Sequence, residues 1–338
     1  MDLNIIWFIL LGVLIAGYAI LDGFDLGVGM LHLGAKGDDN RRIMLNAIGP
    51  VWDGNEVWLL TAGGALFAAF PDVYATVFSG FYTAFMLFLA VLIFRAVSIE
   101  FRSKVESPSW RKIWDGTFSV CSYMIALLLG VTLANIVTGV PVGIDKEFAG
   151  SFFGLLQPYA IVFGISSVLM MRMHGTIYMT MKTDGDFQKY FVKKVNRILI
   201  LFIGSYVVLH AWTIIEFPNL IDNYTANPIL FIFPALIILS ALMIPGFVKR
   251  AKYFRAFVMS SSIILFSIAM VAAGIFPNLL LSNPDAANSL TIYNAASSQA
   301  TLSNMLIIAI IGVPIVLGYT IFVYRIFKGK VELDETSY

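Results

Sequence analysis

The sequence has one cysteine, three histidines and few charged side chains. Cys121 cannot form a disulfide within the chain, and a lone cysteine excludes a metal site built on cysteine spacing, so we interpret it as a small buried helix residue. Only 13% of the 338 residues are charged, whereas 59% are hydrophobic. The mean hydropathy is +0.84. This composition excludes an ordinary soluble domain and offers no basic surface for nucleic acid, and it indicates a membrane protein.

The chain contains nine long apolar runs, and a helix needs roughly 20 apolar residues to cross a bilayer. We therefore predict an all-α fold in which residues 1–338 form a single transmembrane helical-bundle domain. The longest outer connection, about 277–302, is rich in Asn, Ser and Ala and is predicted to form a surface cap. The predicted spans are about 5–33, 43–69, 75–100, 116–139, 151–174, 197–217, 229–245, 253–276 and 303–326.

Basic residues are distributed unevenly between the predicted connections. Of the 22 lysines and arginines, all but Lys146 lie in or beside alternate connections or in the C-terminal tail. Because lysine and arginine gather on the cytoplasmic side of a membrane protein, we predict an outer N-terminus and a cytoplasmic C-terminus. The first span has no basic flank before its apolar run and is too long for a signal peptide, so we expect it in the mature protein.

Carboxylates interrupt the first two apolar runs. Asp22 and Asp25 lie in the first, and Asp53 and Glu56 lie in the second. An Asp at the centre of a bilayer costs about 2.5–3.5 kcal/mol on insertion scales, so such a residue is by default a functional candidate. A rise of about 1.5 Å per residue places Asp22, Asp25 and Asp53 at one depth, roughly 10–15 Å from the cytoplasmic end.

We expect these carboxylates to come together in space. The first two spans are antiparallel and joined by a short loop, and Gly23 and Gly27 form a surface of small residues that would let helices approach closely. Asp22 and Asp25 are neighbours on one helical face because they are three residues apart. Repulsion and desolvation would then increase the proton affinity of at least one carboxyl group, so that it accepts and releases protons near neutral pH. This pattern predicts a proton relay open to the cytoplasm.

Structural alternatives exist for each of these polar residues. Asp22 could cap a broken helix, and Asp53 follows Pro50, which can bend a span. Asn55 could join helices by hydrogen bonding, and Trp52 could simply pack. Both of these residues are therefore equally compatible with a structural role and with a supporting role in the relay.

Three further charged residues are candidates for the entrance of the path. Glu56 lies about 100° around the helix from Asn55 and could serve a different interface. Arg95 and Glu100, near the inner end of the third span, could form an ion pair there, although Arg95 is equally compatible with anchoring at the membrane interface.

The histidines decide whether the chain itself could hold haem. Two stacked b haems need two pairs of axial histidines on facing helices. The chain has only His32, His174 and His210, which fall in the first, fifth and sixth predicted spans. We therefore predict that no histidine here is a haem ligand and that the chain holds no metal.

Four segments resemble subunit II, the smaller core subunit of cytochrome bd-type quinol oxidases. They are LDGFDLGVG (21–29), IGPVWDGNEVW with TAGGALFAAFP (48–71), FSGFY (78–82) and SLTIYNAASSQATL (289–302). The resemblance implies a heterodimer with a larger nine-helix subunit I, which carries haem b, haem d and the quinol-oxidising loop. It also implies proton uptake through Asp25 and Asp53, with Asp22 in the same motif, and less certain roles for Trp52, Asn55 and Arg95.

In such a complex quinol is oxidised on the outer side, dioxygen is reduced to water with cytoplasmic protons, and no protons are pumped. The family also suggests a structural quinone or lipid, a small single-helix accessory subunit and a location in a bacterial or archaeal cytoplasmic membrane. Two other hypotheses remain open on the residues alone. The chain could be a proton-coupled secondary transporter, which would work without the partner, or a purely structural scaffold.

Overall fold

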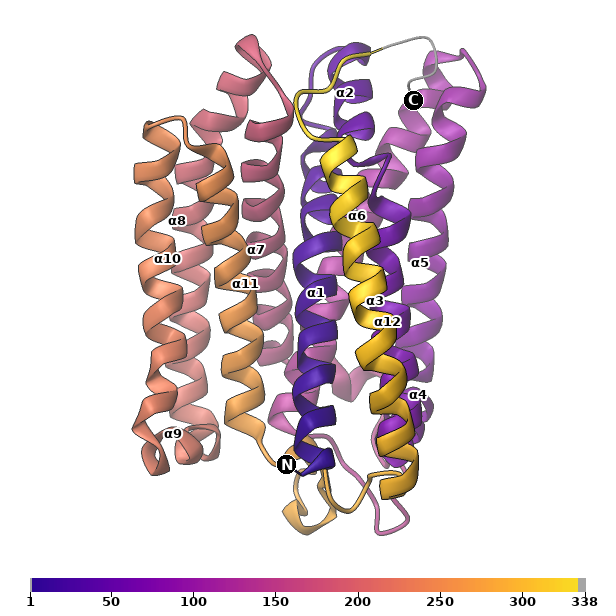
Figure 1. Cartoon of the computed structure of the whole chain (residues 1–338), viewed down its shortest axis with the longest axis vertical. Coiled ribbons are helices and arrows are strands. Elements are labelled where there is room, and N and C mark those ends of the chain that lie inside the picture. The colour runs from indigo at the N-terminus through magenta and orange to yellow at the C-terminus, as the bar shows by residue number, and fades with distance from the viewer. Residues whose placement is uncertain (1, 334–338) are drawn as a thin grey trace.

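The computed structural model describes residues 2–333 as a bundle of long helices (Figure 1). Shorter elements connect or cap them. The long helices are α1 (Leu3–His32), α3 (Trp52–Ala69), α5 (Tyr82–Phe101), α6 (Pro108–Thr138), α7 (Pro158–Lys182), α8 (Gly185–Glu216), α10 (Ile232–Lys249), α11 (Tyr253–Ile275) and α12 (Gln299–Ile326). The short elements are α2 (Asp38–Ile48), α4 (Pro71–Gly80), α9 (Asp222–Ala226), the 3-10 turns η1 (Arg102–Lys104), η2 (Phe153–Leu155), η3 (Pro218–Ile221), η4 (Pro228–Phe231) and η5 (Ala286–Asn288), and the strands β1 (Asn278–Leu280) and β2 (Leu290–Thr291).

The all-α membrane fold predicted from the sequence is confirmed. Among the described residues, eight helices are long and apolar enough to cross a membrane. They are α1, α5 extended by η1, α6, α7, α8, α10 preceded by η4, α11 and α12. The other long helix, α3, has 18 residues and carries Asp53, Asn55 and Glu56 in its first turns, which lower its hydropathy. The count of nine spans and the orientation therefore stay predictions.

Two of the predicted spans are broken in their interior, and the fifth, about 151–174, becomes an α-helix only at Pro158. The second, about 43–69, is broken because α2 ends at Ile48 and α3 begins at Trp52. Pro50 lies in the break, where it donates no backbone hydrogen bond and disfavours helical geometry in the residue before it. The third, about 75–100, is interrupted at Phe81, which separates α4 from α5. The first break places the polar residues of α3 at the start of a helix.

Helix α1 lies at the middle of the bundle and contacts α3, α6, α7 and α11. In Figure 1, α8, α10 and α11 lie on one side of it, and α3, α5 and α12 lie on the other. The C-terminal half of α1 is buried almost without interruption from Asp22 to His32. This central position is the reason why the acidic motif of α1 lies inside protein.

Glycines set the closest approaches of α1, but not against the partner predicted from the sequence. A Cβ atom on Gly27 would lie 2.2 Å from the carbonyl oxygen of Met171, and one on Gly175 would lie 2.6 Å from the Cα atom of Gly27. Gly23 likewise faces Met171. The Gly23 and Gly27 surface therefore packs against α7, and our expectation that it faces α3 was wrong. The close contact of α1 with α3 is at Gly17, against the ring of Trp58.

The connection at 277–302 covers the end of the bundle from which α1 starts, at the bottom of Figure 1. Its two short strands, β1 and β2, pair antiparallel. Asn4 donates a hydrogen bond of 2.8 Å to the carbonyl of Ile292, and Trp7 donates one of 3.0 Å to the carbonyl of Leu302. These bonds attach the start of α1 to the connection before α12 and to the first turn of α12.

Candidate functional site

The interior of the bundle holds a cluster of ionisable side chains from three helices. Arg95 of α5 forms ion pairs with Asp22 of α1, at 2.9 Å, and with Glu56 of α3. Arg95, Asp22 and the nearby Asp25 have no exposed surface. The cluster contains three carboxyl groups and one guanidinium group, so one cation cannot neutralise all the negative charge. Because an uncompensated buried charge is costly, such a cluster has the capacity to hold protons.

A second set of contacts links Asp25 to α3 and α12. Asn55 donates a hydrogen bond of 2.7 Å to Asp25 Oδ2 and a longer one of 3.3 Å to the carbonyl of Leu21. Tyr324, near the end of α12, donates a hydrogen bond of 2.9 Å to Asn55 Oδ1. The other carboxyl oxygen of Asp25, Oδ1, is buried and has no hydrogen-bond partner among the described residues. The same holds for Asp22 Oδ2, so the site contains two buried carboxyl oxygens without a described hydrogen bond or ion pair.

Of the candidates on the first two spans, the structure joins four to one site: Asp22, Asp25, Asn55 and Glu56. Glu56 and Asn55 do serve different partners, since Glu56 pairs with Arg95 and Asn55 bonds to Asp25. The structure places Asp53 elsewhere. Its side chain is exposed on the surface of α3, so it is not part of the buried cluster.

The remaining predicted site residues have clearer surroundings than the sequence could give them. Trp52 is 8% exposed and packs in the hydrophobic core. The ion pairs of Arg95 are with Asp22 and Glu56, and its complete burial rules out a role as an anchor at the membrane interface. Glu100 lies further along α5 and is partly buried. Sequence reasoning missed Tyr324, because nothing in the apolar α12 marks one tyrosine as facing another helix.

A separate charged cluster lies where α1 ends. The carboxylate of Asp115 on α6 is fully buried and interacts with three groups. They are the Nε2 atom of His32 at 2.5 Å, Arg41 Nη1 at 2.8 Å and Arg102 Nε at 2.6 Å. His32 Nε2 therefore pairs with a carboxylate, and through Asp115 it connects the end of α1 to α6 and η1.

This cluster continues outward through Asp38, which bonds to Arg102 at 2.6 Å and to Arg111 at 2.7 Å. The outer side of the cluster lines a cleft of about 290 Å³ at the predicted cytoplasmic end. The cleft brings water close to buried charges. Its lining residues are Gly37, Asp38, Arg41, Glu106, Pro108, Arg111, Lys112 and Asp115.

The other two histidines are also engaged by protein groups. Both ring nitrogens of the buried His174 are hydrogen bonded, Nδ1 to Ser260 Oγ at 2.8 Å and Nε2 to the carbonyl of Ile20 at 3.0 Å. His210 Nδ1 bonds to the carbonyl of Tyr206, one turn earlier in α8. Within residues 2–333 no group of three His, Cys, Asp or Glu side chains could hold a metal ion.

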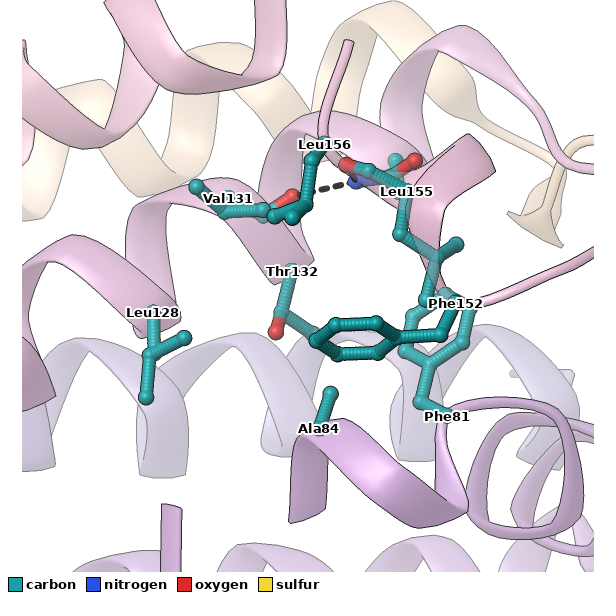
Figure 2. A pocket seen from close by; sticks show the side chains of 9 residues that line it. Phe81, Ala84, Leu128, Val131, Thr132, Phe152, Leu155 and Leu156 are labelled. Carbon is teal, nitrogen blue, oxygen red and sulfur yellow. Dashed lines mark hydrogen bonds between the residues drawn. The ribbon is translucent and has the colours of Figure 1, made fainter. Parts of the chain in front are cut away.

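A small cavity lies near the other end of the bundle, between α5, α6 and the segment around η2 (Figure 2). Its volume is about 20 Å³, and apolar side chains such as Phe81, Phe152 and Leu156 line most of it. Asn135 closes one wall by donating a hydrogen bond to the carbonyl of Leu155. This volume suits about one water molecule, so the cavity is too small for a quinone ring.

Comparison with known proteins identifies the family of this chain. Residues 3–327 match the family described as cytochrome bd terminal oxidase subunit II. The chain belongs to this family. It is 36% identical to cytochrome bd-I ubiquinol oxidase subunit 2 of Escherichia coli (strain K12), with 98% of this chain and 96% of that protein covered. It is 34% identical to cytochrome bd ubiquinol oxidase subunit 2 of Bacillus subtilis (strain 168), with 99% and 98% covered.

The fold also matches a solved oxidase structure. The structure of bd oxidase from Geobacillus thermodenitrificans superposes with a TM-score of 0.79 over 97% of this chain and 99% of that chain, at 18% identity. As a member of the subunit II family, the chain is an integral protein of a bacterial membrane and one subunit of an oxidoreductase complex with a partner subunit I. The family assignment thus favours the oxidase hypothesis over the transporter.

Proposed function

We propose that this chain is the haem-free subunit of a quinol oxidase complex and that it delivers cytoplasmic protons toward the oxygen-reducing centre. In this complex two quinols supply four electrons to one dioxygen, and four protons complete two waters. The haems b and d of the partner subunit carry the electrons. Charge separation arises because protons are released outside and consumed from inside, without pumping. Both ring nitrogens of His174 are hydrogen bonded and His32 Nε2 pairs with Asp115, which supports the assignment of haem to the partner.

The observation that carries this proposal is the buried cluster of Asp22, Asp25, Glu56 and Arg95. Asp25 can accept a proton at its free Oδ1 atom and return it by rotation of the carboxyl group. Arg95 holds Asp22 and Glu56 in fixed positions and limits the negative charge around Asp25. Carboxyl groups enclosed in this way perform the chemistry of proton relays in membranes.

Asp53 extends the proposal to the surface of the subunit. Its exposed carboxylate lies on a helix that also exposes Val57 and Leu60. A carboxylate facing lipid at this depth would cost about 2.5–3.5 kcal/mol, so we expect the partner subunit to cover this face of α3. Asp53 would then lie at the interface and pass protons from this chain to the partner.

The test is quinol-driven oxygen consumption by the purified two-subunit complex carrying Asp25→Asn or Asp53→Asn, with haem content checked by absorbance. We expect turnover to fall by about 100-fold or more, as for loss of a group that transfers protons, while the haem spectrum is retained. Asp186→Asn is the matched control, because Asp186 is an exposed carboxylate whose described ion pair is with Lys189, three residues further along α8. Full turnover in both path variants would assign these acids a structural role.

The same preparation separates the proposal from the alternatives. An oxidase subunit shows haem absorbance only when it is co-purified with subunit I, whereas a transporter would move its substrate in vesicles that contain this chain alone. A scaffold would tolerate Asp25→Asn with unchanged oxygen consumption. Each hypothesis therefore predicts a different result in one set of measurements.

A further inference from the structure

Tyr324 is the one residue of α12 with a described hydrogen bond to the acidic site. Much of α12 lies on the surface, and Tyr319, about one turn earlier, is 67% exposed. Tyr324 instead turns inward, where its ring meets Phe24 edge to face with the centroids 6.4 Å apart. Its hydroxyl lies 2.9 Å from Asn55 Oδ1. This contact connects the last helix of the described chain to the first two long helices.

The contact fixes which end of the Asn55 amide faces Asp25. A carboxamide has one oxygen that accepts and one nitrogen that donates. The Tyr324 hydroxyl donates to the oxygen, while the nitrogen donates to Asp25 Oδ2 and to the carbonyl of Leu21. Asn55 is 2% exposed, so no solvent replaces a lost partner. Without Tyr324, the amide oxygen would be left unpaired in a buried site, so the present orientation of the amide group would lose stability.

Helix α12 is held close to the site by contacts on the far side of Tyr324. Lys182, the last residue of α7, donates a hydrogen bond to the carbonyl of Phe327, and Lys330 donates to the carbonyls of Thr180 and Thr183. Each lysine therefore satisfies free carbonyl groups at or near the end of the other helix. These bonds begin only three residues after Tyr324, so they limit how far its hydroxyl can move from Asn55.

From this geometry we infer that Tyr324 is a positioning residue for the proton relay: it orients Asn55 so that Asp25 Oδ2 is held and Asp25 Oδ1 alone exchanges the proton. The inference rests on the proposed role of Asp25 in proton delivery. It adds a residue whose described hydrogen bond goes to Asn55 and not to a carboxyl group. Its action passes through one hydrogen bond to Asn55 and a second one to Asp25.

The test compares Tyr324→Phe with Tyr319→Phe in the complete two-subunit complex. We expect Tyr324→Phe to lower quinol-driven oxygen consumption about fivefold, the effect of losing one buried hydrogen bond, with haem content unchanged. Infrared difference spectra provide a readout that does not depend on turnover. The carboxyl band that disappears in Asp25→Asn should shift in frequency in Tyr324→Phe and stay in place in Tyr319→Phe.

A double-mutant cycle tests whether the effect passes through Asn55. In the Asn55→Leu background, Tyr324→Phe should cause no further loss of turnover and no further band shift. An unshifted Asp25 band, or a full additional loss in the Asn55→Leu background, would overturn the inference. If Asp25→Asn retains turnover, the proposed relay fails, but the band shift in Tyr324→Phe would still show that Tyr324 positions Asp25.

Discussion

Arg95 Nη2 on α5 lies 2.9 Å from Asp22 Oδ1 on α1, and neither side chain is exposed. The same guanidinium group also pairs with Glu56 on α3. One cation therefore joins three helices in the interior of the bundle. Desolvation makes a buried ion pair expensive to form, but removing one partner is costlier because the other charge is left alone.

Replacing Arg95 by methionine should therefore destabilise the subunit strongly. The change keeps a long side chain but leaves Asp22 and Glu56 without their cation, at an expected cost of about 3–5 kcal/mol. Thermal unfolding of the purified complex, followed by loss of haem absorbance, measures this effect. Arg95→Lys is the control, because it keeps the charge and should recover part of the stability. A methionine variant as stable as the parent would show that the carboxyl groups do not depend on Arg95.

The crossing of α1 and α7 predicts a second stability effect. A methyl group on Gly175 would lie 2.5 Å from the carbonyl carbon of Gly27, where only backbone atoms could give way. We expect Gly175→Ala to force the helices apart and cost about 1–3 kcal/mol. Gly12→Ala is the matched control, since no atom lies within 4 Å of the added group. Equal unfolding temperatures for the two variants would contradict this packing.

The sequence predicted the all-α class, because hydropathy depends on residue type alone. It also marked the acidic motif as a functional candidate, because a charge within a membrane is costly. It further pointed to Pro50 as a place where a span could bend, and α2 does end two residues before it. It did not predict that α1 packs with Gly27 against α7, since a small-residue surface carries no information about which neighbour it meets. The choice of partner depends on the whole bundle.

Only the local part of the candidate site could be predicted from the sequence. Asp22 and Asp25 share a face because of their spacing, and that property is local. The pairing of Arg95 with Asp22 and Glu56 joins residues up to 73 positions apart. Tyr324 lies still further along the chain, in a helix whose sequence is apolar on all sides, so no periodic pattern distinguishes its inward face. Long-range polar contacts of this kind require the three-dimensional structure.

The cluster at the end of α1 leads to a third prediction. Asp115 is fully buried between His32, Arg41 and Arg102. Asp115→Asn would leave the buried Arg102 without its main carboxylate, so we expect a loss of about 3 kcal/mol or more in stability. Asp39→Asn, an exposed carboxylate on α2, should have no measurable effect. Chemical denaturation of the two complexes side by side measures the difference, and a stable Asp115→Asn complex would argue against this network.

The lysine contacts between α7 and α12 lead to the last prediction. Lys330 donates hydrogen bonds to the carbonyls of Thr180 and Thr183 at the end of α7. The last carbonyl groups of a helix have no hydrogen-bond partner within the helix. Val331 adds a backbone hydrogen bond of 2.9 Å to the carbonyl of Lys182. In Lys330→Gln the shorter, uncharged side chain should release the segment after α12, so that amide hydrogen exchange at 327–333 becomes about fivefold or more faster, as expected for loss of a hydrogen bond from a charged donor. Lys328→Gln removes a neighbouring exposed charge and should leave exchange unchanged. If both variants exchange at the parent rate, Lys330 is not what holds the end of α12, and the contacts of Lys182 and Val331 hold this segment instead.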